Sequence, residues 1–128
     1  MVKIISMSLS EDLLAEMDRV QKELGFSGRS EVIRAGVRMF LADNREKEKL
    51  AGKLDSILMV IHNQKAEDAV TKIKHSFEDI IKTQIHSHLK GDKCLEIFTL
   101  DGDARRIKEL VKLLQASRKM DYVKLIVA

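Results

Sequence analysis

Two segments of alternating residues, joined by a short turn, constrain the fold of this chain more than any other feature. The first segment covers residues 82–90 and the second covers 93–100, with Gly91 between them. Side chains alternate between the two faces of a strand, and a turn of this length containing glycine favours an antiparallel hairpin. With the turn centred on Gly91, His88 is predicted to lie directly opposite Cys94.

The predicted hairpin concentrates side chains that bind metal ions. His86 and His88 are two residues apart, so they point to one face of a strand, and Cys94 is the only cysteine in the chain. Directly opposed residues have Cβ atoms about 4.5–5.5 Å apart, so two imidazoles and one thiolate can converge on a single ion. A planar array of such donors favours nickel(II) or copper(II), whereas a tetrahedral one favours zinc.

A fourth ligand is needed to complete either array. His75, near the end of a predicted helix, is a candidate, and the residues alone leave open whether it comes from the same chain or from a second subunit. His62 lies near the end of a predicted strand, where histidines are commonly solvent-exposed. We therefore expect His62 to be an exposed residue rather than a ligand.

Length and composition point to a small protein that associates. The chain has 128 residues, one cysteine and a net charge of +3. With no long apolar run and no signal-like N-terminus, we expect a soluble cytoplasmic protein with no membrane partner. The first 50 residues are electrically neutral, so global charge is no argument for nucleic-acid binding. Domains this small often depend on oligomerisation for stability.

The first 45 residues predict a strand and two helices. Residues 3–9 alternate as in a half-buried strand, Ser10 is a predicted N-cap, and Gly25 is a predicted C-cap for the first helix. Ser30 is the predicted N-cap of the second helix. One strand and two helices cannot bury this much apolar surface, so we expect an intertwined dimer with a two-stranded antiparallel ribbon. The alternative is a helical hairpin whose edge strand serves dimerisation only.

The remainder of the chain predicts a second domain. The mixed-charge residues 43–53 could extend the second helix and release it at Gly52, and we interpret them as a linker. The elements expected after it are a strand over 55–62, a helix over about 64–77, strands over 82–90 and 93–100, a helix over about 102–118, and a strand over 121–127. This βαββαβ order is the ferredoxin-like arrangement, so the whole chain is predicted to be an α+β protein.

The first part of the chain resembles ribbon-helix-helix transcription factors, the group that includes the methionine and Arc repressors. The resemblance rests on the alternating strand and on Gly-Phe-Ser-Gly-Arg-Ser-Glu-Val-Ile-Arg at 25–34. Strands of that group read DNA in the groove. The resemblance implies a double-stranded DNA operator whose major groove faces Ile4, Ser6 and Ser8. It also implies DNA backbone contacts near Lys3, Arg29, Ser30 and Arg34.

The whole chain resembles the NikR family of nickel-responsive regulators. The strongest match is His75-x10-His86-x-His88-x5-Cys94, followed by Leu-Glu-Ile. The resemblance implies a ribbon-helix-helix domain over 1–46 and a ferredoxin-like, ACT-type domain over 54–128. It also implies one nickel(II) per subunit in a planar site, with His86, His88 and Cys94 from one subunit and His75 from another. Such a protein would be a homotetramer, a dimer of dimers, in which nickel promotes operator binding and represses nickel uptake genes.

Two other classes of function remain to be weighed. A metalloenzyme would need an open coordination position to activate water, and a site filled by four protein ligands has none. We therefore expect no enzymatic activity. The other alternative is a ribbon-helix-helix regulator whose ACT-like domain senses a different metal or a small molecule.

Overall fold

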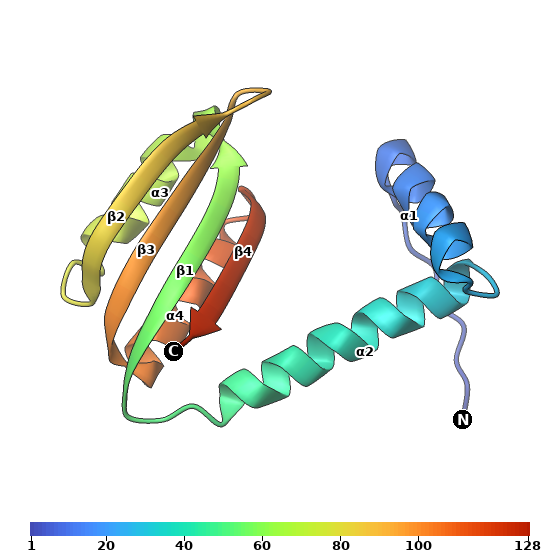
Figure 1. Cartoon of the computed structure of the whole chain (residues 1–128), viewed down its shortest axis with the longest axis horizontal. Coiled ribbons are helices and arrows are strands. Elements are labelled where there is room, and N and C mark those ends of the chain that lie inside the picture. Colours follow the sequence, from blue (N-terminus) through green and yellow to red (C-terminus); the bar gives the residue numbers. More distant parts are fainter. The chain divides into compact units, whose positions relative to one another are not determined.

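The computed structural model describes all residues, 1–128 (Figure 1). The chain divides into two compact units, Met1–Lys49 and Leu50–Ala128. Each unit is described by itself below. No helix combines the length and the apolar character needed to cross a lipid bilayer.

The first unit contains two helices, α1 (Glu11–Leu24) and α2 (Arg29–Glu48). As predicted, Ser10 caps α1 by accepting a hydrogen bond from the Leu13 N–H at 3.2 Å, and Gly25 ends it at a φ of 75°. The predicted cap of α2 was wrong, because the N-cap is Gly28 and Ser30 lies in the first turn. Glycine is only a few tenths of a kcal/mol worse than serine as an N-cap, so the earlier start costs little.

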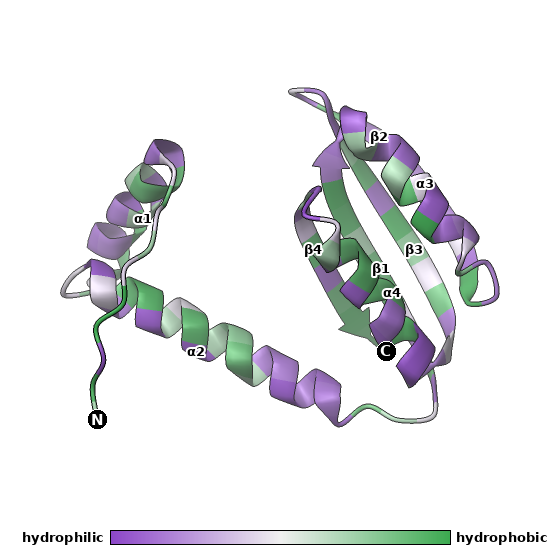
Figure 2. Ribbon diagram, turned by 180° about the vertical axis from the view of Figure 1, so that it is seen from behind, coloured by the Kyte–Doolittle hydropathy of each residue, from purple (hydrophilic) through white to green (hydrophobic).

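Residues 1–10 form neither a helix nor a strand in the single chain. The strand predicted over 3–9 is therefore not formed here, because a strand needs a hydrogen-bonded neighbour and the chain supplies none. Neither α1 nor α2 contains a buried residue. Figure 2 shows hydrophobic residues recurring along α2, where Met39 is 73% exposed and Phe40 69% exposed. Within one chain, this unit leaves several large apolar side chains in water.

The segment interpreted as a linker, 43–53, is helical in its first half. The helix α2 continues through it to Glu48, and an i,i+4 ion pair of 2.9 Å between Lys47 and Asp43 supports this last part. Gly52, with a φ of 74°, ends the connection immediately before the first strand. The residues up to Glu48 thus extend the second helix, as the sequence allowed, because opposite charges at helical spacing favour the helix. Only the residues after Glu48 act as a linker.

The second unit has the predicted ferredoxin-like order. Its elements are β1 (Lys53–Asn63), the 3₁₀ turn η1 (Gln64–Ala66), α3 (Glu67–His75), β2 (Ile81–Leu89), β3 (Lys93–Asp103), α4 (Ala104–Ala116) and β4 (Met120–Val127). All strand pairs are antiparallel, and the order across the sheet is β2-β3-β1-β4. The helix predicted over 64–77 is shorter than expected, because η1 forms its start and the chain leaves the helix after His75.

Helices α3 and α4 cover the same face of the sheet (Figures 1 and 2). The core between these helices and the sheet contains, among others, Leu58, Val60, Phe77, Phe98, Leu100, Ile107, Leu110 and Leu114. In β1 the even-numbered residues from 56 to 62 are buried, as are those from 94 to 102 in β3. This alternation assigns the even-numbered side chains of the central strands to the helix-covered face.

Candidate metal centre

The predicted hairpin places two histidines and the cysteine together. His88 on β2 pairs directly with Cys94 on β3, as predicted, and the Sγ and Nδ1 atoms of the two residues lie 3.9 Å apart. The turn between the strands contains Gly91 at a φ of 73° and Asp92 at 58°. Glycine and aspartate are among the few residue types that accept these left-handed angles, so the local sequence determines which residues face each other.

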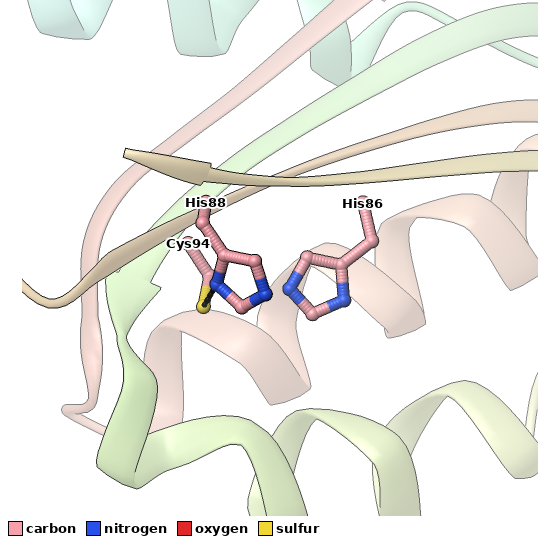
Figure 3. A group of neighbouring side chains, drawn as sticks. All are labelled: His86, His88 and Cys94. Carbon is pink, nitrogen blue, oxygen red and sulfur yellow. Dashed lines mark hydrogen bonds between the residues drawn. The ribbon is translucent and has the colours of Figure 1, made fainter. Parts of the chain in front are cut away.

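His86 completes a group of three donors. One ligand atom from each of His86, His88 and Cys94 lies within 4.8 Å of the other two. The two ring centroids are 5.2 Å apart, and Figure 3 shows a nitrogen of each ring turned toward the other ring. Metal–nitrogen and metal–sulfur bonds are about 2.0–2.3 Å long, so two donors of one ion lie at most about 4.6 Å apart. Small side-chain shifts would bring these three donors to one ion, and the residues fit a nickel(II) site.

The cysteine of this group is fully buried. Its burial, and then the negative charges of Glu67 and Glu96, raise the pKa of the Cys94 thiol above its ordinary value. The thiol is therefore protonated at neutral pH in the absence of a cation. A bound cation must displace this proton, because the thiolate is the form that coordinates a metal.

His75 does not join the group within its own chain. It is the last residue of α3, its side chain is 69% exposed, and its Nδ1 lies 2.8 Å from a Glu78 oxygen. A four-coordinate ion held by the three donors of one chain would therefore have one position left for a ligand from elsewhere. Of the four metal ligands predicted from the sequence, the structure brings three together and leaves the fourth at the surface.

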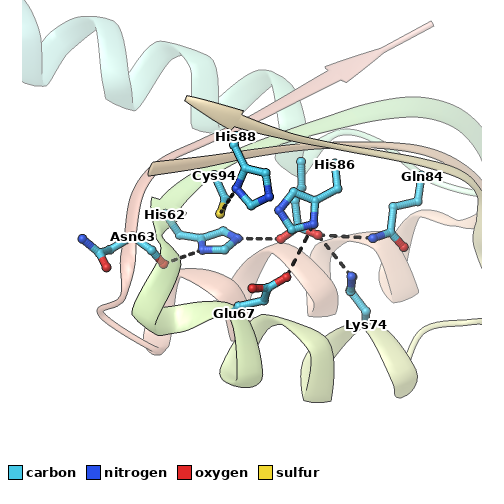
Figure 4. Close-up of polar contacts among 9 residues, drawn as sticks. His62, Asn63, Glu67, Lys74, Gln84, His86, His88 and Cys94 are labelled. Atoms are coloured by element: carbon cyan, nitrogen blue, oxygen red, sulfur yellow. Dashed lines mark hydrogen bonds and ion pairs between the residues drawn. The ribbon is translucent and has the colours of Figure 1, made fainter. Parts of the chain in front are cut away.

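A buried carboxylate, Glu96, lies on the same sheet face as Cys94. Its partners His62, Lys74 and Gln84 are labelled in Figure 4. Glu96 is 1% exposed and pairs across the strands with His86. One carboxylate oxygen lies 2.6 Å from His62 Nε2, while the other accepts from Lys74 Nζ at 3.1 Å and from Gln84 Nε2 at 3.3 Å. These partners come from β1, α3 and β2, so the carboxylate joins α3 to three strands of the sheet.

The prediction that His62 is solvent-exposed was wrong. His62 is fully buried, lies opposite Cys94 in the β1–β3 pair, and has its Nδ1 2.8 Å from the Asn63 carbonyl oxygen. A register shift in the β1–β4 pair between Ile61 and His62 accompanies this placement, and the chain then turns through η1 back over the sheet. Val60 lies two residues before His62 on the same strand and is also buried. Because side chains two apart share a face of a strand, this alternation would have predicted the burial of His62.

The residues implied in DNA binding all belong to the first unit. Lys3, Ile4, Ser30 and Arg34 line a common surface hollow, and Ser6 and Ser8 lie in the exposed N-terminal segment. The Arg29 guanidinium donates two hydrogen bonds of 2.9 Å to Asp18, which lowers the pKa of that carboxyl. Arg34 pairs with Glu31. Both guanidinium groups are thus held by carboxylates in the single chain.

Comparison with known proteins identifies the family. The family model described as "NikR C terminal nickel binding domain" matches residues 56–128. The chain belongs to the NikR family. A relative from Methanocaldococcus jannaschii, named "Putative nickel-responsive regulator", is 39% identical over 124 residues, which cover 94% of this chain and 88% of the relative. A protein of the same name from Methanococcus maripaludis is 36% identical over 126 residues, covering 96% of this chain and 89% of its own.

Two solved structures resemble this NikR-family chain in fold alone. An uncharacterized protein from Thermotoga maritima matches with a TM-score of 0.55 at 20% identity, covering 59% of this chain and 98% of its own. The C-terminal domain of the MgtC protein from Mycobacterium tuberculosis matches with a TM-score of 0.51 at 15% identity, covering 60% of this chain and 89% of its own.

Family membership decides between the classes of function considered from the sequence. NikR proteins are nickel-responsive regulators, so this chain is a regulator and not an enzyme. The matched residues 56–128 include the histidines and the cysteine of the group described above. The expectation that the chain binds nickel is thereby confirmed.

Proposed function

We propose that this chain regulates transcription by binding DNA through residues 1–46 and nickel(II) through residues 54–128. Nickel promotes operator binding, and the genes repressed are those of nickel uptake. The observation that carries the proposal is the convergence of His86, His88 and Cys94, whose ligand atoms lie within 4.8 Å of one another. Two imidazoles and a thiolate are a donor set that suits nickel(II).

The fourth donor of each site is His75 of a neighbouring subunit, giving one nickel per subunit in a planar array. Two features support this proposal. The three donors of one chain leave a position to be filled, and His75 is exposed on its own chain, where it is available to another. The site is then complete only in an assembly, so nickel binding and subunit association stabilise each other.

The assembly proposed is a homotetramer made of two dimers. The sheet face not covered by helices carries apolar side chains that are more than one-third exposed, namely Ile57, Ile85, Tyr122 and Ile126. Exposed apolar surface of this kind commonly marks an interaction site. The first unit also needs a partner, since α1 and α2 contain no buried residue. Pairing residues 3–9 of two chains as an antiparallel ribbon provides one.

In this ribbon, Ile4, Ser6 and Ser8 lie on the face that reads the major groove. Phosphate contacts come from Lys3, from the start of α2 at Arg29 and Ser30, and from Arg34. The start of a helix presents free N–H groups and a positive dipole end, which suit a phosphate. Arg29 and Arg34 can add charge at the same position if DNA draws them from their present carboxylate partners.

A subunit-mixing experiment tests the shared site. One variant, His75→Ala, keeps the three clustered donors, and the other, His86→Ala/His88→Ala, keeps His75. Each is titrated alone with nickel(II) while the near-ultraviolet thiolate-to-metal band is followed, and the two are then unfolded, mixed and refolded together. We expect the wild-type band to be absent from each variant and to return in the mixture, because mixed assemblies contain complete sites.

Controls keep the outcome interpretable. Cys94→Ser, added to the His75→Ala variant, must abolish the band in the mixture, because the band needs the thiolate. Zinc(II) must give no such band even when it binds, because its filled d shell allows no such transition. A wild-type band from His75→Ala alone would exclude the shared site, and a wild-type band from His86→Ala/His88→Ala alone would exclude the histidine ligands.

A further inference from the structure

The first residue of α3 places a carboxylate beside one of the metal ligands, and nothing in the proposed function uses it. Glu67 Oε1 lies 3.6 Å from His86 Nδ1 (Figure 4). The His86 side chain is 25% exposed and that of Glu67 45% exposed, so the pair lies at the edge of the site, partly shielded from water.

The position of Glu67 favours one ring nitrogen of His86 as the metal donor. A neutral imidazole carries its proton on one nitrogen and offers a lone pair on the other. Because Nδ1 faces the carboxylate, the proton is favoured there, and Nε2 on the opposite side of the ring is left as the donor. Figure 3 shows the His86 ring with a nitrogen directed toward His88. The carboxylate therefore favours the tautomer that the metal site needs.

Packing holds Glu67 in this position. The helix α3 begins directly after the buried Ala66, and Val70, one turn further along, is fully buried against the sheet. Near the other end of the helix, Lys74 donates to the buried Glu96. With the helix fixed at both ends, the backbone of Glu67 stays at a distance from which its carboxylate reaches His86.

We propose that Glu67 is a positioning residue of the nickel site: it orients the His86 ring, holds the proton on Nδ1, and thereby increases nickel affinity. The inference rests on the proposed role of His86 as a ligand. Histidine ligands of metals usually donate their second N–H to a carboxylate, a carbonyl or water, and losing such a partner typically lowers metal affinity 10–100-fold.

The adjacent residue provides a matched control. Glu67 and Asp68 are both acidic residues in the first turn of α3, so replacing either with alanine removes one negative charge from the same helix end. Asp68 is exposed, and it is Glu67 that pairs with His86. We expect Glu67→Ala to weaken nickel binding by about 10–100-fold and Asp68→Ala by less than about threefold. Glu67→Gln, which keeps an acceptor but loses the charge, should fall between them.

A measurement without metal separates orientation from a general loss of structure. In nitrogen-15 NMR spectra of the apo-protein at pH 8, where free imidazole is neutral, His86 should carry its proton on Nδ1 in the wild type and in Asp68→Ala. In Glu67→Ala, the two tautomers should both be populated. Circular dichroism of each variant checks that the fold is unchanged.

Three results would overturn the inference: equal nickel affinity in the two alanine variants, an unchanged His86 tautomer in Glu67→Ala, or the same tautomer shift in both variants. His86→Ala distinguishes this failure from a failure of the proposed site. If that variant binds nickel as the wild type does, His86 is no ligand and the site itself is wrong. If it loses nickel while Glu67→Ala does not, only the role of Glu67 is excluded.

Discussion

Lys74 and His75 are consecutive residues of α3 that face different surroundings: Lys74 donates to the buried Glu96 carboxylate at 3.1 Å, whereas His75 is exposed. Successive residues of an α-helix are about 100° apart around its axis. The ion pair made by Lys74, together with the buried Val70, therefore places one side of the helix against the sheet and leaves His75 away from the ligands of its own chain. The outward orientation of a proposed ligand thus follows from the residues of its helix that face the sheet.

Replacing Lys74 should destabilise the second unit. Lys74→Met removes one of the donors that compensate the burial of Glu96, and we expect a loss of about 1–3 kcal/mol in the free energy of unfolding. Lys72→Met is the matched control, since Lys72 lies on the same helix but is exposed. Urea titration of the apo-protein measures both changes. Equal losses in the two variants would mean that the contact with Glu96 contributes nothing.

Alanine substitution at two histidines of this chain should change the stability of the protein by very different amounts. His62 is buried and bonded to Glu96, so His62→Ala leaves a cavity and an incompletely paired carboxylate, at a cost of about 2–4 kcal/mol. His75→Ala changes an exposed residue and should alter the stability of the apo-protein by less than about 0.5 kcal/mol. Thermal unfolding without metal tests the contrast, which would disappear if His62 were at the surface.

Gly102 should not tolerate a side chain. A Cβ atom at this position would lie 2.4 Å from Ile80 Cγ2, so we expect Gly102→Ala to cost about 1–3 kcal/mol by overpacking. Ile80→Ala removes the opposing methyl group, and the double variant should be more stable than the sum of the two single changes predicts. Strict additivity in urea unfolding would argue against the close contact.

Nickel binding should depend on pH because it displaces the thiol proton of Cys94. Burial raises the pKa of this thiol, so the protonated form dominates at neutral pH and each nickel bound releases one proton from it. Below the thiol pKa, the apparent affinity should therefore rise about tenfold per pH unit as pH increases. Competition titrations at pH 7 and pH 8 measure this slope. A flat profile would mean that the thiol is not displaced.

A substitution in the N-terminal segment should weaken DNA binding without changing nickel binding. Ser6→Ala removes a hydroxyl from the proposed groove-facing side and should weaken operator binding by about 1 kcal/mol, roughly fivefold. The nickel absorption band should be unchanged. Met7→Ala, on the other side of the segment, should instead weaken association of the subunits. Gel-shift titrations and light scattering distinguish the two effects, and a changed nickel band in Ser6→Ala would contradict the separation.

Local signals in the sequence were sufficient for most of the second unit. The turn at Gly91 and the alternation on either side of it predicted the pairing of His88 with Cys94, because turn type and a period of two determine the register of a hairpin. The βαββαβ order followed from segment lengths and periodicity. Both kinds of information lie within a few residues along the chain.

The features that the sequence analysis missed depend on contacts between distant residues. The burial of His62 results from its pairing with Cys94, 32 residues later in the sequence, and from the chain folding back at η1. Glu96 and Lys74 were not recognised as partners, because the packing of α3 on the sheet brings them together. The predicted strand over 3–9 has a further requirement, since its neighbour would have to come from another molecule.

The absence of buried residues in α1 and α2 affects how the amount of active regulator depends on its rate of synthesis. If these helices acquire a core only when two chains meet, folding of the first unit and encounter between chains are a single event, governed by mass action. A newly made chain that has not met a partner exposes Phe40 and Met39. Chains that lack a stable core are removed by proteases. We therefore expect the level of DNA-binding regulator to rise more steeply than in proportion to its rate of synthesis, so that a twofold change in expression has more than a twofold effect.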